Sequence, residues 1–306
     1  MQNRLSPSTI VLLTIPPILW SANAIVGRML APLVPPLSLN FLRWLIAAIV
    51  LLPFATHIFK KGSGLWVHRK TYLILGLLGV GIYNAFQYLA LRSSTPINVT
   101  LVASGMPIWM MLVGSWFFGA PLQGRQIWGA LLSMAGVLVV MCRGEWAHLL
   151  ELRLVPGDLL MILATIAWSF YSWLLSRKDT LGELHRQWAP FLLAQIMYGL
   201  LWSGLFAATE WQQFASYPAW TWNTFLAVFF IAIGPAIIAY RCWGAGVQHA
   251  GANIAGFFVN LTPLFTAILS SMILHEAPHL YHALAFLLIV GGIVISSVSV
   301  PRKEKH

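Results

Sequence analysis

Apolar residues dominate the chain in long runs that are separated by short polar segments. Each run is about twenty residues long, the length that an α-helix needs to cross the hydrocarbon core of a bilayer. A helix satisfies its own backbone hydrogen bonds in lipid, and the alternating pattern of a membrane β-barrel is missing. The pattern predicts an all-α integral membrane protein with ten transmembrane helices, near residues 9–30, 37–56, 71–91, 97–118, 125–142, 156–176, 187–208, 221–240, 250–274 and 280–299.

Composition strengthens this interpretation. Of the 306 residues, 59% are hydrophobic and only 8% are charged, whereas a soluble domain carries about a quarter charged residues. The ten runs leave no room for a large soluble domain. The first run follows "MQNRLSPST" without a small-residue cleavage site, so we expect a retained helix and not a signal peptide.

The net charge of +10 is explained by the positive-inside rule. With the N-terminus inside, thirteen of the 18 Lys and Arg residues fall on the cytoplasmic side. Five fall on the other side: Arg28, Arg43, Arg92, Arg143 and Arg153. We therefore expect a multi-pass protein of the bacterial inner membrane with both termini in the cytoplasm. We expect its surface to contact the lipid bilayer, and we expect no nucleic-acid partner.

The chain contains an internal repeat. "SGMPIWMMLVGSWFFGAP" (104–121) resembles "NLTPLFTAILSSMILHEAP" (260–278), and "ILWSANAIVGR" (18–28) resembles "IAWSFYSWLLSR" (166–177). The repeat divides the chain into two halves, residues 1–148 and 149–306, that form one transport unit. Five spans is an odd number, so the second half enters the membrane in the opposite orientation. Such inverted repeats are typical of secondary transporters, which bind solutes at the midplane between the halves.

Two prolines occupy matching points of the halves. Pro107 and Pro263 lack the backbone N–H that a continuous helix needs, and each ring opposes a carbonyl one turn earlier. A carbonyl freed in lipid needs protein or water to satisfy it. Matched breaks therefore indicate a hinge or a wall of the central site. The alternative is a kink that only helps the helices to pack.

Polar and aromatic side chains within the spans suggest a solute pocket. In the third span, "GIYNAFQYLALR", Tyr83 and Gln87 are four residues apart and share a helix face. Seven of the 15 tryptophans lie near span ends, where indoles settle at the membrane interface, whereas Trp20, Trp109, Trp168 and Trp173 lie within spans. For the mid-span amides, a simple interhelical hydrogen bond is the alternative. The predicted aromatic–amide pocket consists of Trp20, Asn23, Tyr83, Gln87, Trp109, Trp168, Tyr171 and Asn260.

Charged groups are missing from the centres of the spans. None of the eight acidic residues falls at a span centre, where proton-driven carriers usually keep a relay. The sequence thus favours facilitated transport over proton-coupled antiport, with His275 and Glu276 as the fallback relay. Nucleotide-sugars are disfavoured because no buried Arg or Lys is expected to await a phosphate.

Other functional classes fit less well. An intramembrane enzyme would need a nucleophile, base or metal at one depth. His275, His279 and His282 have suggestive spacing, but Pro278 lies among them, so we expect solvated loop histidines and no metal or cofactor. No glycine-rich phosphate loop with Lys is present to drive a pump. A channel would require a continuous polar stripe, whereas the polar residues are scattered.

The order of these motifs resembles the EamA family of the drug/metabolite transporter superfamily. The resemblance rests on "WSAN" in the first span, "NFLRWLIAA" in the second, "ALRSSTP" before the fourth, and "GAP" and "HEAP" after the fourth and ninth. It covers nearly the whole chain, although "GAP" stands where the family often has an acidic residue. Within the family, the chain is most similar to bacterial aromatic amino-acid exporters. The resemblance implies an exporter of aromatic amino acids, and the missing mid-span charges favour neutral or zwitterionic solutes in general. From the inverted repeat we expect alternating access, and we expect a monomer.

Overall fold

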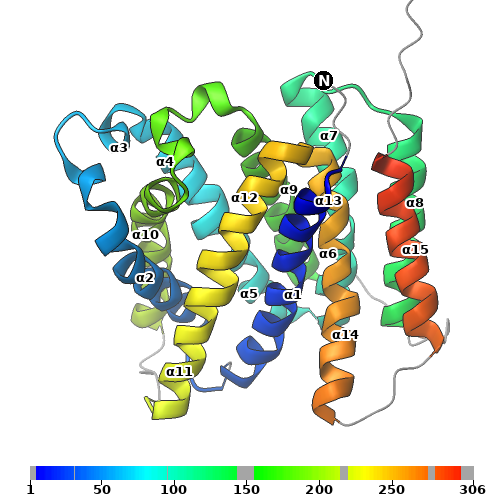
Figure 1. Cartoon of the computed structure of the whole chain (residues 1–306). Helices are drawn as coiled ribbons and strands as arrows, with labels where there is room; N and C mark the ends of the chain where they lie inside the picture. The colour runs from blue at the N-terminus through cyan, green and yellow to red at the C-terminus, as the bar shows by residue number, and fades with distance from the viewer. Residues whose placement is uncertain are drawn as a thin grey trace, which may run out of the picture.

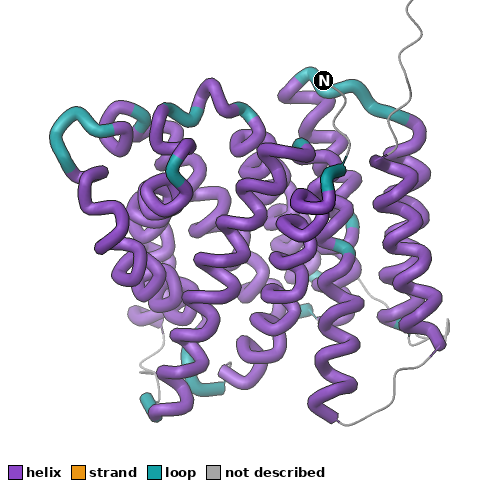
Figure 2. Tube along the Cα trace, viewed as in Figure 1, coloured by secondary structure: helices purple, strands orange, loops and turns teal. Residues whose placement is uncertain are grey.

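The computed structural model describes residues 5–30, 32–94, 96–142, 155–213, 220–274 and 280–297. These residues form helices and connecting loops, without a strand among them (Figure 2). The first half contains α1 (Pro7–Leu30), α2 (Pro36–Ala55), η1 (Thr56–Phe59), α3 (Gly64–Val67), α4 (Arg69–Leu75), η2 (Gly76–Ile82), α5 (Tyr83–Ser93), α6 (Pro96–Ser104), α7 (Met106–Phe118) and α8 (Gly124–Met141). The second half contains α9 (Pro156–Ser176), η4 (Lys178–Thr180), η5 (Glu183–Arg186), α10 (Trp188–Gln213), α11 (Trp222–Ile231), η6 (Ala232–Ile238), α12 (Ala239–Ala250), α13 (Ala252–Val259), α14 (Leu261–Leu274) and α15 (Leu280–Ser297).

The predicted all-α membrane architecture is confirmed. Within the described residues, nine helical stretches are long and apolar enough to cross a membrane. The tenth predicted span, the fourth along the chain, consists of the two shorter helices α6 and α7. Successive spans alternate in direction, so α1 begins and α15 ends at the same end of the bundle (Figure 1). The first spans of the two halves, α1 and α9, consequently run in opposite directions.

The two halves interleave and do not form separate lobes. Helix α2 packs against α10, α5 against α9, α8 against α15, and α1 against both α12 and α14. Every one of these pairs joins one helix of the first half to one of the second. The predicted junction at residues 148 and 149 lies outside the described residues. The solute path therefore has to be sought among helices of both halves and not at a flat interface.

Helices α8 and α15 meet through glycine. A Cβ added to Gly292 would lie 2.5 Å from the backbone oxygen of Gly129, and one added to Gly129 would lie 2.7 Å from the oxygen of Gly292. Side chains this small allow helix backbones to touch in lipid, where van der Waals packing drives association. We call this contact the glycine seam; it includes Ser133, which lies beside Gly292.

Both halves interrupt their helices at matching points. Spans four and nine break at Gly105 and Asn260, and Pro107 and Pro263 follow within the first turn of the next helix. Spans three and eight contain the π-helical segments η2 and η6. Their first residues are 156 positions apart, which is also the separation of the two prolines. Single π-helical turns occur frequently at functional sites. The repeat thus extends from sequence to backbone irregularities.

Candidate functional site

An aromatic cluster occupies the region where η2, α5, α9 and α12 meet α1. Its centre is Trp168 on α9, whose side chain is 1% exposed. The Trp168 ring lies 4.7 Å from that of Tyr83, 5.0 Å from Tyr171 and 5.4 Å from Trp20, measured between centroids. Four of the eight residues predicted to form the pocket therefore lie together.

The two tryptophans from matching positions of the halves touch each other. Trp20 and Trp168 pack edge to face, with an interplanar angle of 84°, an arrangement that aromatic quadrupoles favour. The Trp20 indole N–H donates to the carbonyl of Pro235 in η6, at 3.3 Å. A partly buried indole needs such a partner. Helix α1 is thereby fixed to the irregular part of the eighth span.

The two π-helical spans are joined by hydrogen bonds beside this cluster. The Asn84 amide donates to the Tyr240 hydroxyl at 3.2 Å and to the Gly79 carbonyl at 3.3 Å. Tyr240 donates to the same carbonyl at 2.6 Å. Glycine is required at position 79 because a Cβ there would lie 2.7 Å from the Tyr171 ring. Tyr171 in turn donates to the Gln195 side-chain oxygen at 2.9 Å.

Arg43 is a buried cation, which corrects one prediction from the sequence. No buried Arg or Lys is expected there, and that prediction is wrong. Helix α2 begins at Pro36, so Arg43 lies about two turns inside it, with 1% exposure. One guanidinium nitrogen donates to the Tyr88 hydroxyl at 3.4 Å, and the group stands 5.0 Å over the Trp44 ring.

The other predicted pocket residues are more dispersed. Gln87 lies one turn beyond Tyr83 on α5 and is half-buried. Asn23 lies one turn beyond Trp20 on α1; it is buried, and its Oδ1 has no hydrogen-bond partner in the described part of the chain. Trp109 on α7 is half-buried and, among the described residues, makes no ring contact with the cluster. Proximity to the cluster therefore supports Asn23 and Gln87 more than Trp109.

Asn260 serves a different contact. At the break between α13 and α14, its amide donates to the Ser133 hydroxyl of α8 at 3.0 Å. This is the interhelical hydrogen bond that the sequence leaves open as the alternative. Its Oδ1 is buried without a partner within the described residues.

Sequence reasoning missed two aromatic members of the cluster. Tyr240 and Trp243 lie 5.3 and 5.5 Å from Trp168 between ring centroids. Hydropathy predicts that the eighth span ends at residue 240, beside Arg241, whereas the helix continues to Ala250. A signal is present in the sequence, because Asn84 and Tyr240 are 156 positions apart, like the two prolines.

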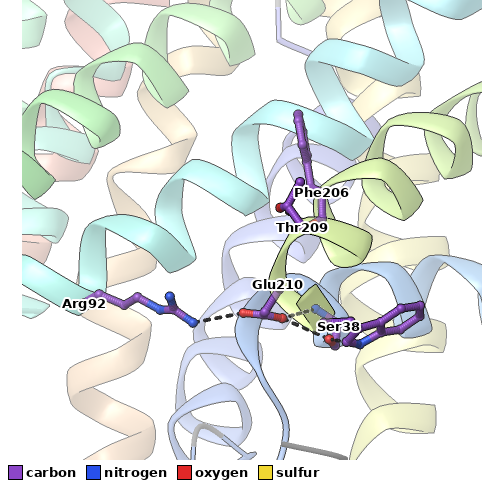
Figure 3. Close-up of polar contacts among 6 residues, drawn as sticks. Ser38, Arg92, Phe206, Thr209 and Glu210 are labelled. Atoms are coloured by element: carbon purple, nitrogen blue, oxygen red, sulfur yellow. Dashed lines mark hydrogen bonds and ion pairs between the residues drawn. The ribbon is translucent and has the colours of Figure 1, made fainter. Parts of the chain in front are cut away.

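A polar clasp joins the halves at the end of the bundle where α2 begins and α5 ends. In Figure 3, Arg92 and Ser38 reach Glu210 of α10 from opposite sides. The buried Glu210 carboxylate accepts from the Ser38 N–H at 2.8 Å, from its hydroxyl at 2.9 Å and from Arg92 at 3.0 Å. It thus caps the start of α2, whose free N–H groups favour an anion. Asp158 similarly accepts from the Val155 N–H at 2.9 Å at the start of α9.

The histidines give no support for a metal enzyme. His282 is not a solvated loop residue as predicted: α15 begins at Leu280, and the His282 ring is buried, 4.2 Å from that of Tyr281 between centroids. His275, Glu276, Pro278 and His279 lie outside the described residues. Elsewhere in the described ranges no three His, Cys, Asp or Glu side chains gather as metal ligands would.

Two oppositely directed repeats with broken helices at matching points form the architecture of secondary membrane transporters. The family comparison agrees, because the model of the "EamA-like transporter family" matches twice, over residues 7–142 and 155–298. The chain belongs to the EamA-like transporter family, and it is a multi-pass membrane transporter and not an enzyme.

Relatives occur in bacteria and archaea. An "Uncharacterized transporter" of Archaeoglobus fulgidus is 25% identical over 296 residues, 96% of this chain and 98% of the relative. The "Aromatic amino acid exporter YddG" of Ancylobacter novellus is 27% identical over 283 residues, 92% of this chain and 94% of that protein. A solved structure described as "Crystal structure of protein" has a TM-score of 0.71 at 24% identity, covers 95% and 97% of the two chains, and supports the fold alone.

Proposed function

We propose that this transporter exports small neutral or zwitterionic metabolites, with aromatic amino acids as the favoured substrates. The observation that carries the proposal is the contact between Trp20 and Trp168, the matched indoles of the two halves, within a cluster that includes Tyr83 and Tyr171. Aromatic side chains stack on flat apolar solutes while their N–H and O–H groups bind polar ends. The likeness to the Ancylobacter novellus exporter supports the same substrate class.

The route that we propose is alternating access through the interrupted helices. Spans four and nine break at Gly105 and Asn260, and η2 and η6 interrupt spans three and eight. Pro107 and Pro263 would act as the hinges of spans four and nine. Movement at these points would open the aromatic cluster to one side of the membrane at a time.

Transport is proposed to be facilitated and not proton-coupled. Among the described residues, the two buried acids, Asp158 and Glu210, both lie near span ends and bind backbone N–H groups at helix starts. Proton relays usually sit within the membrane, facing the solute path. The solute's own gradient would therefore drive its export.

Counterflow in liposomes tests this function. Purified protein is reconstituted with unlabelled solute inside, and uptake of labelled Phe, Trp, Thr and Met is followed at equal pH on both sides. We expect Phe and Trp to exchange faster than Thr. Uptake that requires an imposed pH gradient would contradict facilitation, and an absence of Phe and Trp exchange would contradict the aromatic substrates.

Substitutions in the cluster test where the solute binds. Trp168→Ala and Tyr83→Ala should each slow Phe exchange by about tenfold, because each removes about a kilocalorie or more of ring contact. Trp128→Ala is the matched control, since that indole is 69% exposed on α8. Unchanged kinetics in the two cluster variants, at normal yield, would remove both residues from the proposed site.

We further propose that both termini lie in the cytoplasm, on the basis of the positive charge in the corresponding loops, and that the protein acts as a monomer. Single cysteines placed at each terminus of a variant without Cys142 and Cys242 should resist an impermeant thiol reagent in intact cells. Labelling of either terminus would reverse that assignment.

A further inference from the structure

Arg43 carries a buried positive charge that no carboxylate of the described residues pairs with. Within the described ranges, no carboxylate lies within 4.0 Å of its guanidinium, and its Nε has no hydrogen-bond partner. The bond to the Tyr88 hydroxyl, at 3.4 Å, is long. A guanidinium offers five N–H donors, and an uncompensated buried ion destabilises a protein by several kilocalories per mole. The protein retains an incompletely satisfied cation that faces other helices.

This cation borders the aromatic cluster. The ring beneath it, that of Trp44, lies 4.8 Å from the Tyr240 ring, and Tyr240 lies 5.3 Å from Trp168, between centroids. A solute stacked on the cluster could therefore present a polar end to Arg43.

A buried hydrogen-bond acceptor, the side-chain oxygen of Asn40, lies on the same helix as the donor Arg43. Asn40 precedes it by three residues and so shares its face of α2. Asn40 is 1% exposed; its amide nitrogen donates to the Val80 carbonyl at 3.1 Å, and its Oδ1 has no partner among the described residues. A donor-rich cation and a free acceptor on one helix face complement a carboxylate and an ammonium group on one small molecule.

We propose that Arg43 binds the carboxylate of the transported solute and that Asn40 accepts a hydrogen bond from its ammonium group. This assignment rests on the proposed function and narrows it, because it makes the solute an α-amino acid with a free carboxylate. The planar guanidinium can bind a carboxylate through two parallel N–H donors. Aromatic amines, amides and cationic drugs would stack on the cluster but leave Arg43 unpaired.

Competition at the native protein tests the assignment without any substitution. L-Phenylalanine, L-phenylalaninamide, 3-phenylpropionate and L-leucine compete with labelled phenylalanine in counterflow. We expect L-phenylalanine to compete at least about thirtyfold better than its amide, the factor that follows from truncating one partner of a buried charge pair. 3-Phenylpropionate, which keeps the carboxylate and lacks the ammonium group, should lie between them. An amide that competes as well as the amino acid would overturn the assignment.

Variants separate recognition from a structural role. Arg43→Gln should bring the preference for acid over amide close to one, whereas Arg43→Lys, which keeps the charge, should retain part of it. Arg241→Gln is the matched control, because Arg241 also stands over an indole, at 4.6 Å from the Trp188 ring, but is exposed. Equal losses for acid and amide in Arg43→Gln would show that Arg43 only supports the fold. If Arg43→Gln does not fold, the Arg43→Lys variant and the competition series with the native protein decide whether Arg43 recognises the carboxylate.

The same assays distinguish the two proposals. If leucine exchanges as fast as phenylalanine and tryptophan, and if its exchange depends on Arg43, then the aromatic preference fails and carboxylate recognition stands. If no carboxylate in the series exchanges or raises the melting temperature of the purified protein, the role of Arg43 is overturned.

Discussion

The glycine seam and the aromatic cluster both join the two halves, but they do so with different parts of the chain. In the seam, Gly129 and Gly292 bring backbone against backbone, so an added Cβ would stand 2.5 Å from a carbonyl oxygen. In the cluster, the halves meet through rings and amides such as Trp20, Trp168 and Asn84. Side chains can change rotamer, whereas touching backbones cannot separate without the helices moving. The seam therefore behaves as a fixed contact, and the cluster is the contact that can admit a solute.

Substitution in the seam should have the largest effect on stability. Gly292→Val forces a branched side chain against the Gly129 carbonyl and the Ser133 side chain, whose Cβ would be 2.8 Å from the new Cβ. Overpacking of this kind costs about 3 kcal/mol or more when backbone must shift. We expect little folded protein in fluorescence-detected size-exclusion chromatography. Gly27→Val on α1 is the control, because nothing lies within 4 Å of its added Cβ; equal yields would refute the close approach of α8 and α15.

The polar clasp is a third kind of contact between the halves, and its removal should lower the stability less than Gly292→Val does. Glu210→Ala leaves the Ser38 N–H and hydroxyl without their acceptor at the start of α2. A hydrogen bond to a charged group contributes about 1.5–3 kcal/mol, so we expect a loss of about 2 kcal/mol, seen as a lower melting temperature. Arg92→Ala should lower it less, since the Arg92 side chain is 41% exposed. A larger effect of Arg92→Ala would assign the stabilisation to the ion pair and not to the helix cap.

Tyr240→Phe should separate stability from transport, which no change in the glycine seam can do. The variant keeps the ring but removes the hydroxyl that binds the Gly79 carbonyl and the Asn84 amide. The expected loss of stability is about 1 kcal/mol. Because this hydroxyl connects the two π-helical spans, we expect phenylalanine counterflow to change severalfold while the melting temperature changes little. Unchanged counterflow would place the hydroxyl outside the transport movement.

Part of how the two halves meet can be predicted from the sequence. Hydropathy locates the spans, and aligning the halves pairs Trp20 with Trp168, whose rings lie 5.4 Å apart in the folded protein. The two prolines likewise mark spans that break at Gly105 and Asn260. These features follow from periodicity and from the missing N–H of proline, both of which act locally.

Features that depend on neighbouring helices are not predictable in this way. The sequence predicts no buried Arg or Lys, yet in the folded protein the Arg43 side chain is 1% exposed and donates to the Tyr88 hydroxyl of α5. His282 is expected in a loop because Pro278 precedes it, but the helix starts early enough to turn its ring inward. The π-helical segments η2 and η6 are not predicted by the apolar pattern of spans three and eight. In each case the tertiary environment, and not the local pattern, decides the outcome.

The smallest effect on stability is expected for substitution of Asn260, a predicted pocket residue that contacts the glycine seam. Its amide binds Ser133, a seam residue, while its Oδ1 has no partner within the described ranges. Interhelical hydrogen bonds in membranes contribute about 0.6 kcal/mol on average. If Asn260 only packs, Asn260→Ala and Ser133→Ala should each lower the melting temperature slightly and leave phenylalanine counterflow unchanged. If Asn260 also binds solute, Asn260→Ala alone should slow counterflow, because Ser133→Ala removes the same bond but keeps the amide. That difference between the two variants decides whether the solute site reaches the ninth span or ends at the aromatic cluster.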